Sequence, residues 1–198
     1  MRLTRSFFAR DTIVVAKEFL GKILVRRIGK KIIKARIIET EAYIGEQDQA
    51  CHARFGPTKR NAPMYGEAGH AYIYLCYGVH ELLNIVTEEK DLPAAVLIRV
   101  VDVVDVNRCN MAFGDDRRQK PYFNELKIGV KLLGPGSLTK FLEITRELNG
   151  EDLTKSKKLR VVDDGFKIKK SRIKSAERIG VSYAGKWAKR RWRFYFDL

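Results

Sequence analysis

The stretch KIIKARIIETEAYIG, residues 31–45, constrains this chain most, because it indicates a long β-strand with an unusual polar face. Its β-branched residues follow ILVRRI across the turn IGKK, a pattern that predicts a β-hairpin with a long second strand. Strand side chains alternate between faces, so Glu39, Glu41 and Tyr43 share one face. Two acids and a phenol make a poor hydrophobic core. They form either a solvent-facing stripe or a reactive site with one general base or an acid/base pair.

Length and composition predict a single domain over residues 1–198. The chain has 198 residues, 45% of them hydrophobic, which is enough for a real core. It has no apolar run of about 18 residues and no signal-peptide pattern in MRLTRSFFARDTIVV, so we expect a cytoplasmic protein without a membrane span. Cys51, Cys76 and Cys109 lack CxxC spacing, and Cys51, His52, Cys76 and His80 lack the paired spacing of zinc ligands. We therefore expect neither a disulfide framework nor a metal site.

The positive charge is concentrated in the last fifth of the chain. The net charge is +15, and residues 155–193 hold 15 Lys and Arg against three acids, a local balance of +12. Such a field is typical of a solvated surface or of a protein that binds a polyanion, most often nucleic acid.

The order of predicted elements favours a mixed α+β class. A helix begins with Asp11 and Thr12 as its cap and ends near Leu20 before Gly21. Turn-forming residues fill 46–69, a loop long enough to suggest function. The remaining predicted strands are HAYIYLCY (70–77), VHELLNIVT (79–87), PAAVLIRVVDVV (93–104), KLRVVDD (158–164) and RWRFYFDL (191–198). The predicted helices are ELKIGVKLLG (125–134) and SLTKFLEITREL (137–148), the second stopped by Asn149-Gly150, and 107–124 is a predicted loop. These elements predict one domain with a curved, mostly antiparallel sheet, flanking helices and a protruding hairpin.

Aromatic residues and one glycine-rich turn suggest further contacts. Tyr72 and Tyr74 share a strand face, and Tyr77 lies where that chain turns. They either pack within the sheet or form, with Tyr43, a cage for a flat or cationic ligand, and a tyrosine at a hairpin tip could wedge between stacked bases. The Gly-Pro-Gly turn at 134–136 is either a plain connection, an anion-binding helix start or a helix-hairpin-helix element.

Taken together in order, these motifs resemble the alkyladenine (3-methyladenine) DNA glycosylase family. The resemblance rests on ETEAY (39–43), His52, RNAPMYGEAGHAYIYLCYGVH (60–80), Asn84, VLIR (96–99), GPGSLTKFL (134–142), RIGVSYAGKWA (178–188) and RFYF (193–196). It covers nearly the whole chain. The family is monofunctional: it flips alkylated or deaminated purines out of duplex DNA and hydrolyses the N-glycosidic bond, leaving an abasic site.

The resemblance implies a role for each matching residue. It makes Glu41 the general base, Arg99 the arginine beside the catalytic water and Tyr77 the residue that fills the hole in the duplex. It places Tyr43, His52 and Tyr74 around the flipped base and Asn84 where it disfavours the 2-amino group of normal guanine. It also makes Met64 and Tyr65 minor-groove contacts and residues 178–180 the backbone at the water site. We add Tyr72 to the base pocket and Arg60 to the DNA contacts. Tyr65 and Glu81 depart from the residues usual in the family.

The physical chemistry fits this implied reaction. A purine alkylated at N3 or N7 is cationic, so an electron-rich cage favours it and the base leaves with little acid assistance. One carboxylate then suffices to prepare the water, and Arg99 nearby would keep Glu41 ionised. Glu39 need not be catalytic, and we expect it in a supporting hydrogen bond or ion pair. We expect a monomer that binds duplex DNA and needs no metal or organic cofactor. Rival hypotheses are a helix-hairpin-helix glycosylase, a sugar O-glycosidase using Glu39 and Glu41, and a non-catalytic nucleic-acid-binding module.

Overall fold

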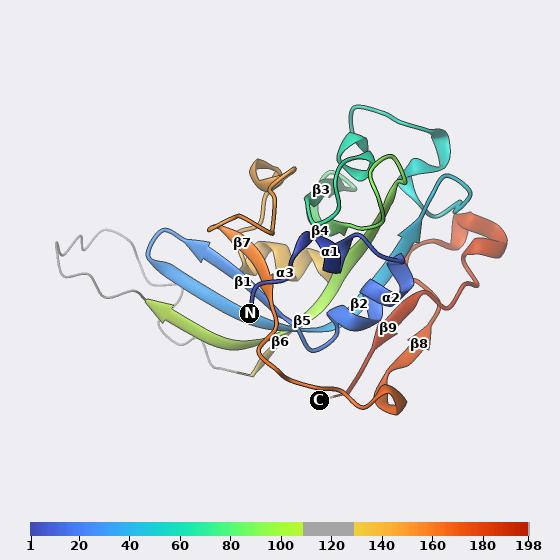
Figure 1. The fold of residues 1–198 in the computed structure, drawn as a ribbon. Coiled ribbons are helices and arrows are strands. Elements are labelled where there is room, and N and C mark those ends of the chain that lie inside the picture. Colours follow the sequence, from blue (N-terminus) through green and yellow to red (C-terminus); the bar gives the residue numbers. More distant parts are fainter. Residues whose placement is uncertain (109–128, 198) are drawn as a thin grey trace.

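Two long neighbouring strands, β2 (Lys31–Ile44) and β5 (Ala94–Arg108), run through the centre of an antiparallel sheet (Figure 1). The computed structural model describes residues 1–108 and 129–197. The sheet order is β3-β4-β5-β2-β1-β7, with β6 on β5, and β9 pairing with both β2 and β8. The other strands are β1 (Ile23–Ile28), β3 (Ala71–Cys76), β4 (His80–Val86), β6 (Val130–Leu133), β7 (Leu159–Val162), β8 (Lys174–Ala176) and β9 (Arg193–Tyr195).

Helices and short 3-10 turns complete the described part of the chain. The α-helices are α1 (Arg5–Phe8), α2 (Thr12–Phe19) and α3 (Pro135–Phe141), and the 3-10 segments are η1 (His52–Phe55), η2 (Ala62–Tyr65), η3 (Arg146–Leu148), η4 (Lys170–Arg172) and η5 (Ser182–Trp187). Phe8, Val15 and Leu138 from the three α-helices pack in the same main core as Ile33 and Ile98 of the central strands. The helices therefore flank the sheet as predicted.

A β-bulge in β2 turns the acidic residues away from this core. Ile37 pairs with Val101 and Glu39 with Val100, which leaves Ile38 as an extra residue. Ile37 and Ile38 are consecutive, yet both are buried in the main core. Strict alternation from Ile37 would point Glu39 inward as well. The extra residue reverses the alternation, so Glu39 and the odd-numbered positions after it face the other side.

A matching irregularity in β5 places Arg99 beside those acids. Glu39 pairs with Val100 and Thr40 with Ile98, so Arg99 is the unpaired residue. Ile98 is buried in the main core, whereas Arg99 lines the cleft described below. The two bulges thus bring acids and arginine together on one face of two adjacent strands.

Most predicted elements are confirmed, including the α+β class and the mostly antiparallel sheet. α2 begins at the predicted cap, where Asp11 accepts a hydrogen bond from the Val14 N–H at 2.9 Å. The β1–β2 hairpin and the β3–β4 hairpin form at the predicted turns. The sheet also contradicts the nearly all-helical architecture that the helix-hairpin-helix hypothesis requires. The predicted loop 107–124 lies mostly outside the described residues.

Two helix predictions are wrong. Residues 130–133 form the strand β6 because they pair with the free edge of β5, which overrides their helical spacing; residues 125–128 lie outside the described part. The helix predicted over 137–148 ends at Phe141, since Glu143 adopts a left-handed backbone with a φ of 48°. This turn lets Ile144 enter the core.

Candidate active site

Glu41 is a fully buried carboxylate held by three donors. One oxygen, Oε2, accepts a hydrogen bond from the Tyr43 hydroxyl at 2.7 Å. The other, Oε1, accepts from the Ile179 N–H at 2.9 Å and lies 3.3 Å from Nη1 of Arg99. The exposed fraction of Glu41 is 0%. Such a set of donors fixes the orientation of the carboxylate, as a general base requires.

Burial raises the pKa of Glu41 despite these contacts. Loss of solvent is the largest influence and disfavours the charged form, while Arg99, the Ile179 N–H and the Tyr43 hydroxyl each lower the pKa. The sequence interpretation expected Arg99 to keep Glu41 ionised, and Arg99 does act in that direction, but burial outweighs it. The result is a stronger base than a surface carboxylate.

Glu39 forms ion pairs with two arginines, Arg99 and Arg193. Its Oε1 accepts from Nε of Arg99 at 2.9 Å and lies 3.3 Å from Nη1 of Arg193. The supporting ion pair predicted for Glu39 is confirmed. These ion pairs tie Glu39 to an arginine on each of two neighbouring strands, β5 and β9.

Tyr43 links the carboxylate to the aromatic residues of the pocket. Burial and the adjacent Glu41 charge raise the pKa of Tyr43 well above its usual value, so the phenol stays protonated and donates. Tyr74 lies on the neighbouring wall, with its ring centroid 4.4 Å from that of His52 and 5.4 Å from that of Tyr72. The structure thus brings the five predicted base-pocket residues, Tyr43, His52, Tyr72, Tyr74 and Asn84, together around one space.

His52 is neutral in this cage. Burial, reinforced by the positive charges of Arg60 and Arg54, lowers the pKa of His52 to about 4. Its Nδ1 lies 2.8 Å from the hydroxyl of Tyr72, which is itself buried behind it. A neutral imidazole presents a π-face to a cationic ligand without charge repulsion.

The cage opens into a cleft of about 790 Å³, a size that suits a small-molecule ligand. Tyr43, His52, Tyr74 and Arg99 line it. A small recess of about 20 Å³ continues inward to Met64, Asn84 and Ala95. Asn84 is buried there, and its Nδ2 donates to the carbonyls of Tyr72 and Leu82 at 3.2 and 3.3 Å. The cleft therefore has an aromatic wall and a recess that reaches Asn84, and its lining residue Tyr43 is hydrogen-bonded to Glu41.

Tyr77 stands at the mouth of the cleft on the tip of the β3–β4 hairpin. It is 88% exposed, and both Tyr77 and Gly78 have positive φ, of 49° and 70°. Positive φ at both central residues is the geometry of tight hairpin turns. Val79 beside it is 72% exposed, a tip residue that the sequence interpretation did not single out.

The three predicted DNA contacts occupy different environments. Met64 is only 2% exposed and packs behind the pocket, so its side chain does not reach the surface. The Tyr65 hydroxyl donates to Oε1 of Glu46 at 2.9 Å. Arg60 lines the cleft, donates to the Leu75 carbonyl at 3.1 Å and lies over the Tyr74 ring at 5.2 Å.

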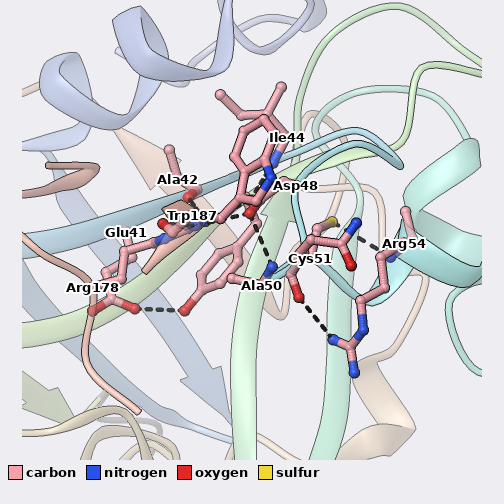
Figure 2. A network of polar contacts seen from close by, with 12 residues as sticks. Glu41, Ala42, Ile44, Asp48, Ala50, Cys51, Arg54, Arg178 and Trp187 are labelled. Carbon is pink, nitrogen blue, oxygen red and sulfur yellow. Dashed lines mark hydrogen bonds and ion pairs between the residues drawn. The ribbon is translucent and has the colours of Figure 1, made fainter. Parts of the chain in front are cut away.

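Sequence reasoning missed a buried ion pair beside Glu41. Arg178 and Asp48 are separated by 130 residues and meet at 2.6 Å with both side chains fully buried (Figure 2). It also missed Arg54, whose guanidinium lies between the rings of Phe55 and Tyr183 at the cleft rim, 4.5 and 5.0 Å from their centroids. No local sequence pattern links residues so far apart. The available signals were Asp48, which follows the acidic strand, and Arg178, which begins the segment 178–180 that resembles the family.

Two classes of site are absent from residues 1–108 and 129–197. There is no group of three or more His, Cys, Asp and Glu side chains that could hold a metal ion. No helix in those ranges is long and apolar enough to cross a membrane.

Comparisons with known proteins agree with this geometry. Residues 6–197 match the family model described as methylpurine-DNA glycosylase. A protein of Methanocella arvoryzae named "Putative 3-methyladenine DNA glycosylase" is 46% identical, covering 98% of this chain and 91% of the relative. Relatives with the same name from Anaeromyxobacter sp. (43% identical, 100% and 90% covered) and Bdellovibrio bacteriovorus (42% identical, 98% and 95% covered) are similar over nearly their whole length.

Proposed function

The chain belongs to the methylpurine-DNA glycosylase family, and from that premise we propose how its site recognises and removes a base. It is a DNA-repair hydrolase that acts on N-glycosyl bonds, and the family supports none of the rival hypotheses. The substrate is an alkylated or deaminated purine in duplex DNA. The observation that carries this proposal is the buried Glu41, held by three donors below an aromatic cleft.

Glu41 prepares the attacking water. The target atom, C1′ of the nucleotide, is inaccessible in stacked DNA, so the nucleotide rotates out of the helix into the cleft. Glu41 accepts a proton from water as the C1′–O bond forms and the C1′–N9 bond breaks. The electrons of the broken bond go to the purine, so a cationic alkylated purine leaves as a neutral base, whereas a neutral deaminated purine leaves as an anion that takes a proton from solvent water. Arg99 and the backbone around Ile179 hold Glu41 in position during this step.

The cage selects bases by charge and shape. Tyr43 and Tyr74 offer electron-rich faces, and His52 stays neutral above a pH of about 4. A cationic purine is attracted by such faces, a contribution of about 0.5–2 kcal/mol. Asn84 and Met64 form the inner wall of the recess and limit which ring substituents fit. This inner-wall role replaces the groove contact first predicted for Met64.

The DNA lies across the hairpin and the basic C-terminal part. Tyr77 and Val79 at the hairpin tip enter the duplex, while exposed Lys and Arg residues within 155–193 hold phosphates without reading sequence. Arg60 and Tyr65 contact the DNA at the cleft side. The protein acts as a monomer, in the cytoplasm where chromosomal DNA is present, and uses no cofactor.

Duplexes carrying one 7-methylguanine, hypoxanthine or ethenoadenine test this function. We expect the wild-type protein to release at least one of these bases and to leave the backbone intact until alkali cleaves the abasic site. An undamaged duplex of the same sequence is the control. Binding to the lesions without alkali-sensitive sites would contradict the proposal and favour a non-catalytic module.

As the pH is lowered, the rate of base release should start to fall at a higher pH than it would if the general base were an ordinary carboxyl group. Glu41 works as a base only when ionised, and its pKa is raised by burial, so activity is lost as the pH falls through that raised value. A single-turnover pH profile on a hypoxanthine duplex measures this acid limb, which is the range of low pH over which the rate falls. His52→Phe is the control, because it removes the other titrating side chain of the cage and should leave the position of the limb unchanged. A limb at the pH of a free glutamate would contradict this assignment.

A further inference from the structure

A buried ion pair between Arg178 and Asp48 lies near Glu41 but does not line the cleft. Arg178 donates from Nη1 and Nη2 to the two oxygens of Asp48 at 2.6 and 2.8 Å (Figure 2). The side chains of both residues are fully buried, and neither residue lines the cleft. Removing two charges from water is expensive, and a well-packed apolar pair of the same volume often serves stability equally well. The pair therefore calls for an explanation beyond stability.

The contacts of Arg178 lead directly to Glu41. Nη1 also donates to the carbonyl of Ala42, the residue after Glu41, at 2.9 Å. The next residue along the chain, Ile179, donates its N–H to Oε1 of Glu41. Arg178 thus holds the backbone on both sides of that hydrogen bond. Nη2 adds a bond to the Trp187 carbonyl at 3.1 Å, which ties the 178–188 segment together.

Arg178 also supports the residue that connects Glu41 with the cage. Its guanidinium carbon lies 4.7 Å from the ring centroid of Tyr43 and 5.1 Å from that of Trp192. Tyr43 lines the cleft and Arg178 does not, so the guanidinium covers the ring from the side away from the ligand. Stacked in this way, the ring keeps the hydroxyl directed at Oε2 of Glu41.

Asp48 fixes the other end of the arrangement. Its carboxylate accepts from the N–H groups of Ala50 and Ile44 at 3.0 and 3.3 Å, which anchors the start of the loop that leads to His52. Ala50 itself lines the cleft and its recess. One ion pair thereby connects three parts of the chain. These are the strand that carries Glu41, the loop that leads to His52 and the C-terminal segment 178–188.

We infer that Arg178 and Asp48 are positioning residues for base excision, which together hold the Ile179 N–H and the Tyr43 hydroxyl on Glu41. The inference rests on the proposed role of Glu41 as general base. The groups facing Glu41 are Tyr43 of its own strand, Arg99 of β5 and Arg178, with the charges of Glu39, Arg193 and Asp48 next to them. Loosening the Arg178–Asp48 ion pair weakens the hydrogen bonds from the Ile179 N–H and the Tyr43 hydroxyl to Glu41. Both bonds favour the ionised carboxylate.

Two variants test the inference by single-turnover base release on a hypoxanthine duplex. Arg178→Lys keeps the charge but cannot bind both Asp48 oxygens and the Ala42 carbonyl together. The double variant Asp48→Asn with Arg178→Met removes both charges and leaves no unpaired one. For both we expect a rate about 10- to 100-fold lower, as positioning losses of this kind give, and an acid limb displaced to higher pH. The matched control is Asp152→Asn, which breaks the ion pair of Asp152 with Arg5, at 2.7 Å and away from the cleft.

The outcomes separate positioning from mere folding. A lower melting temperature with wild-type rate and wild-type acid limb in the folded variants would overturn the inference, and the control should show that behaviour. Should neither variant fold, the Ile179 amide resonance of the wild-type protein decides: it should titrate with the acid limb and exchange slowly with solvent. An amide that exchanges freely and ignores that pH would overturn the inference. Absence of base release by the wild-type protein would instead contradict the proposed function.

Discussion

Replacing Glu41 with glutamine should reduce the single-turnover rate of base release about 1,000-fold, within the range measured for general bases. Glutamine keeps the shape and still accepts from the Tyr43 hydroxyl or the Ile179 N–H, so the fold should survive. It cannot take a proton from water. The loss should therefore appear in the chemical step, with binding to lesion-containing duplex retained, and rapid-quench rates beside a gel-shift titration measure the two separately.

Glu39→Gln is the matched control for this prediction. Both residues are glutamates on one face of β2, and both contact Arg99. Because Glu39 acts through Arg99, its substitution should lower the rate only about 10-fold, the scale of a supporting contact around a reactive group. Equal losses for the two variants would contradict the single-base mechanism and return an acid pair to consideration.

Removing the Tyr77 ring should produce the second large effect. A flipped nucleotide leaves a hole in the stack, and an aromatic residue that fills it replaces about 1–3 kcal/mol of stacking per base. Tyr77→Ala should therefore weaken base flipping and excision by about 10- to 100-fold. Fluorescence of a 2-aminopurine next to the lesion reports flipping directly, since unstacking raises its emission.

Tyr77→Phe provides the control for the wedge. It keeps the ring and removes only the hydroxyl of an 88% exposed residue, so flipping should stay close to wild type. The melting temperature of both variants should match the wild type because the side chain packs against little protein. Normal excision by the alanine variant would contradict the wedge role.

Strand positions and the composition of the site could be predicted because they follow from short-range patterns. Apolar and β-branched runs bounded by turns located the strands that carry Glu41, Tyr74 and Arg99, and the cap at Asp11 located α2. The family resemblance supplied the roles. The conflict between two acids and an apolar strand was also a genuine signal, and its solution is the bulge at Ile38, which no propensity scale indicates.

The remaining features depend on contacts between distant parts of the chain. Residues 130–133 became a strand because β5 offered an edge, a choice that local helical spacing cannot reveal. The Arg178–Asp48 pair joins positions 130 residues apart. Met64 looked suited to a groove contact by its motif, but its burial follows from how the loop 46–69 folds over the pocket. Packing decided these points, and packing is a property of the whole fold.

A crystal structure of the Glu41→Gln variant bound to a duplex with one damaged purine tests the central claim most directly. It should show the purine between Tyr43 and the His52–Tyr74 wall, the C1′ atom facing residue 41, and the Tyr77 ring in the vacated stack. A purine that remains stacked in the duplex, or lies outside the cage while Tyr77 stays in solvent, would contradict the account.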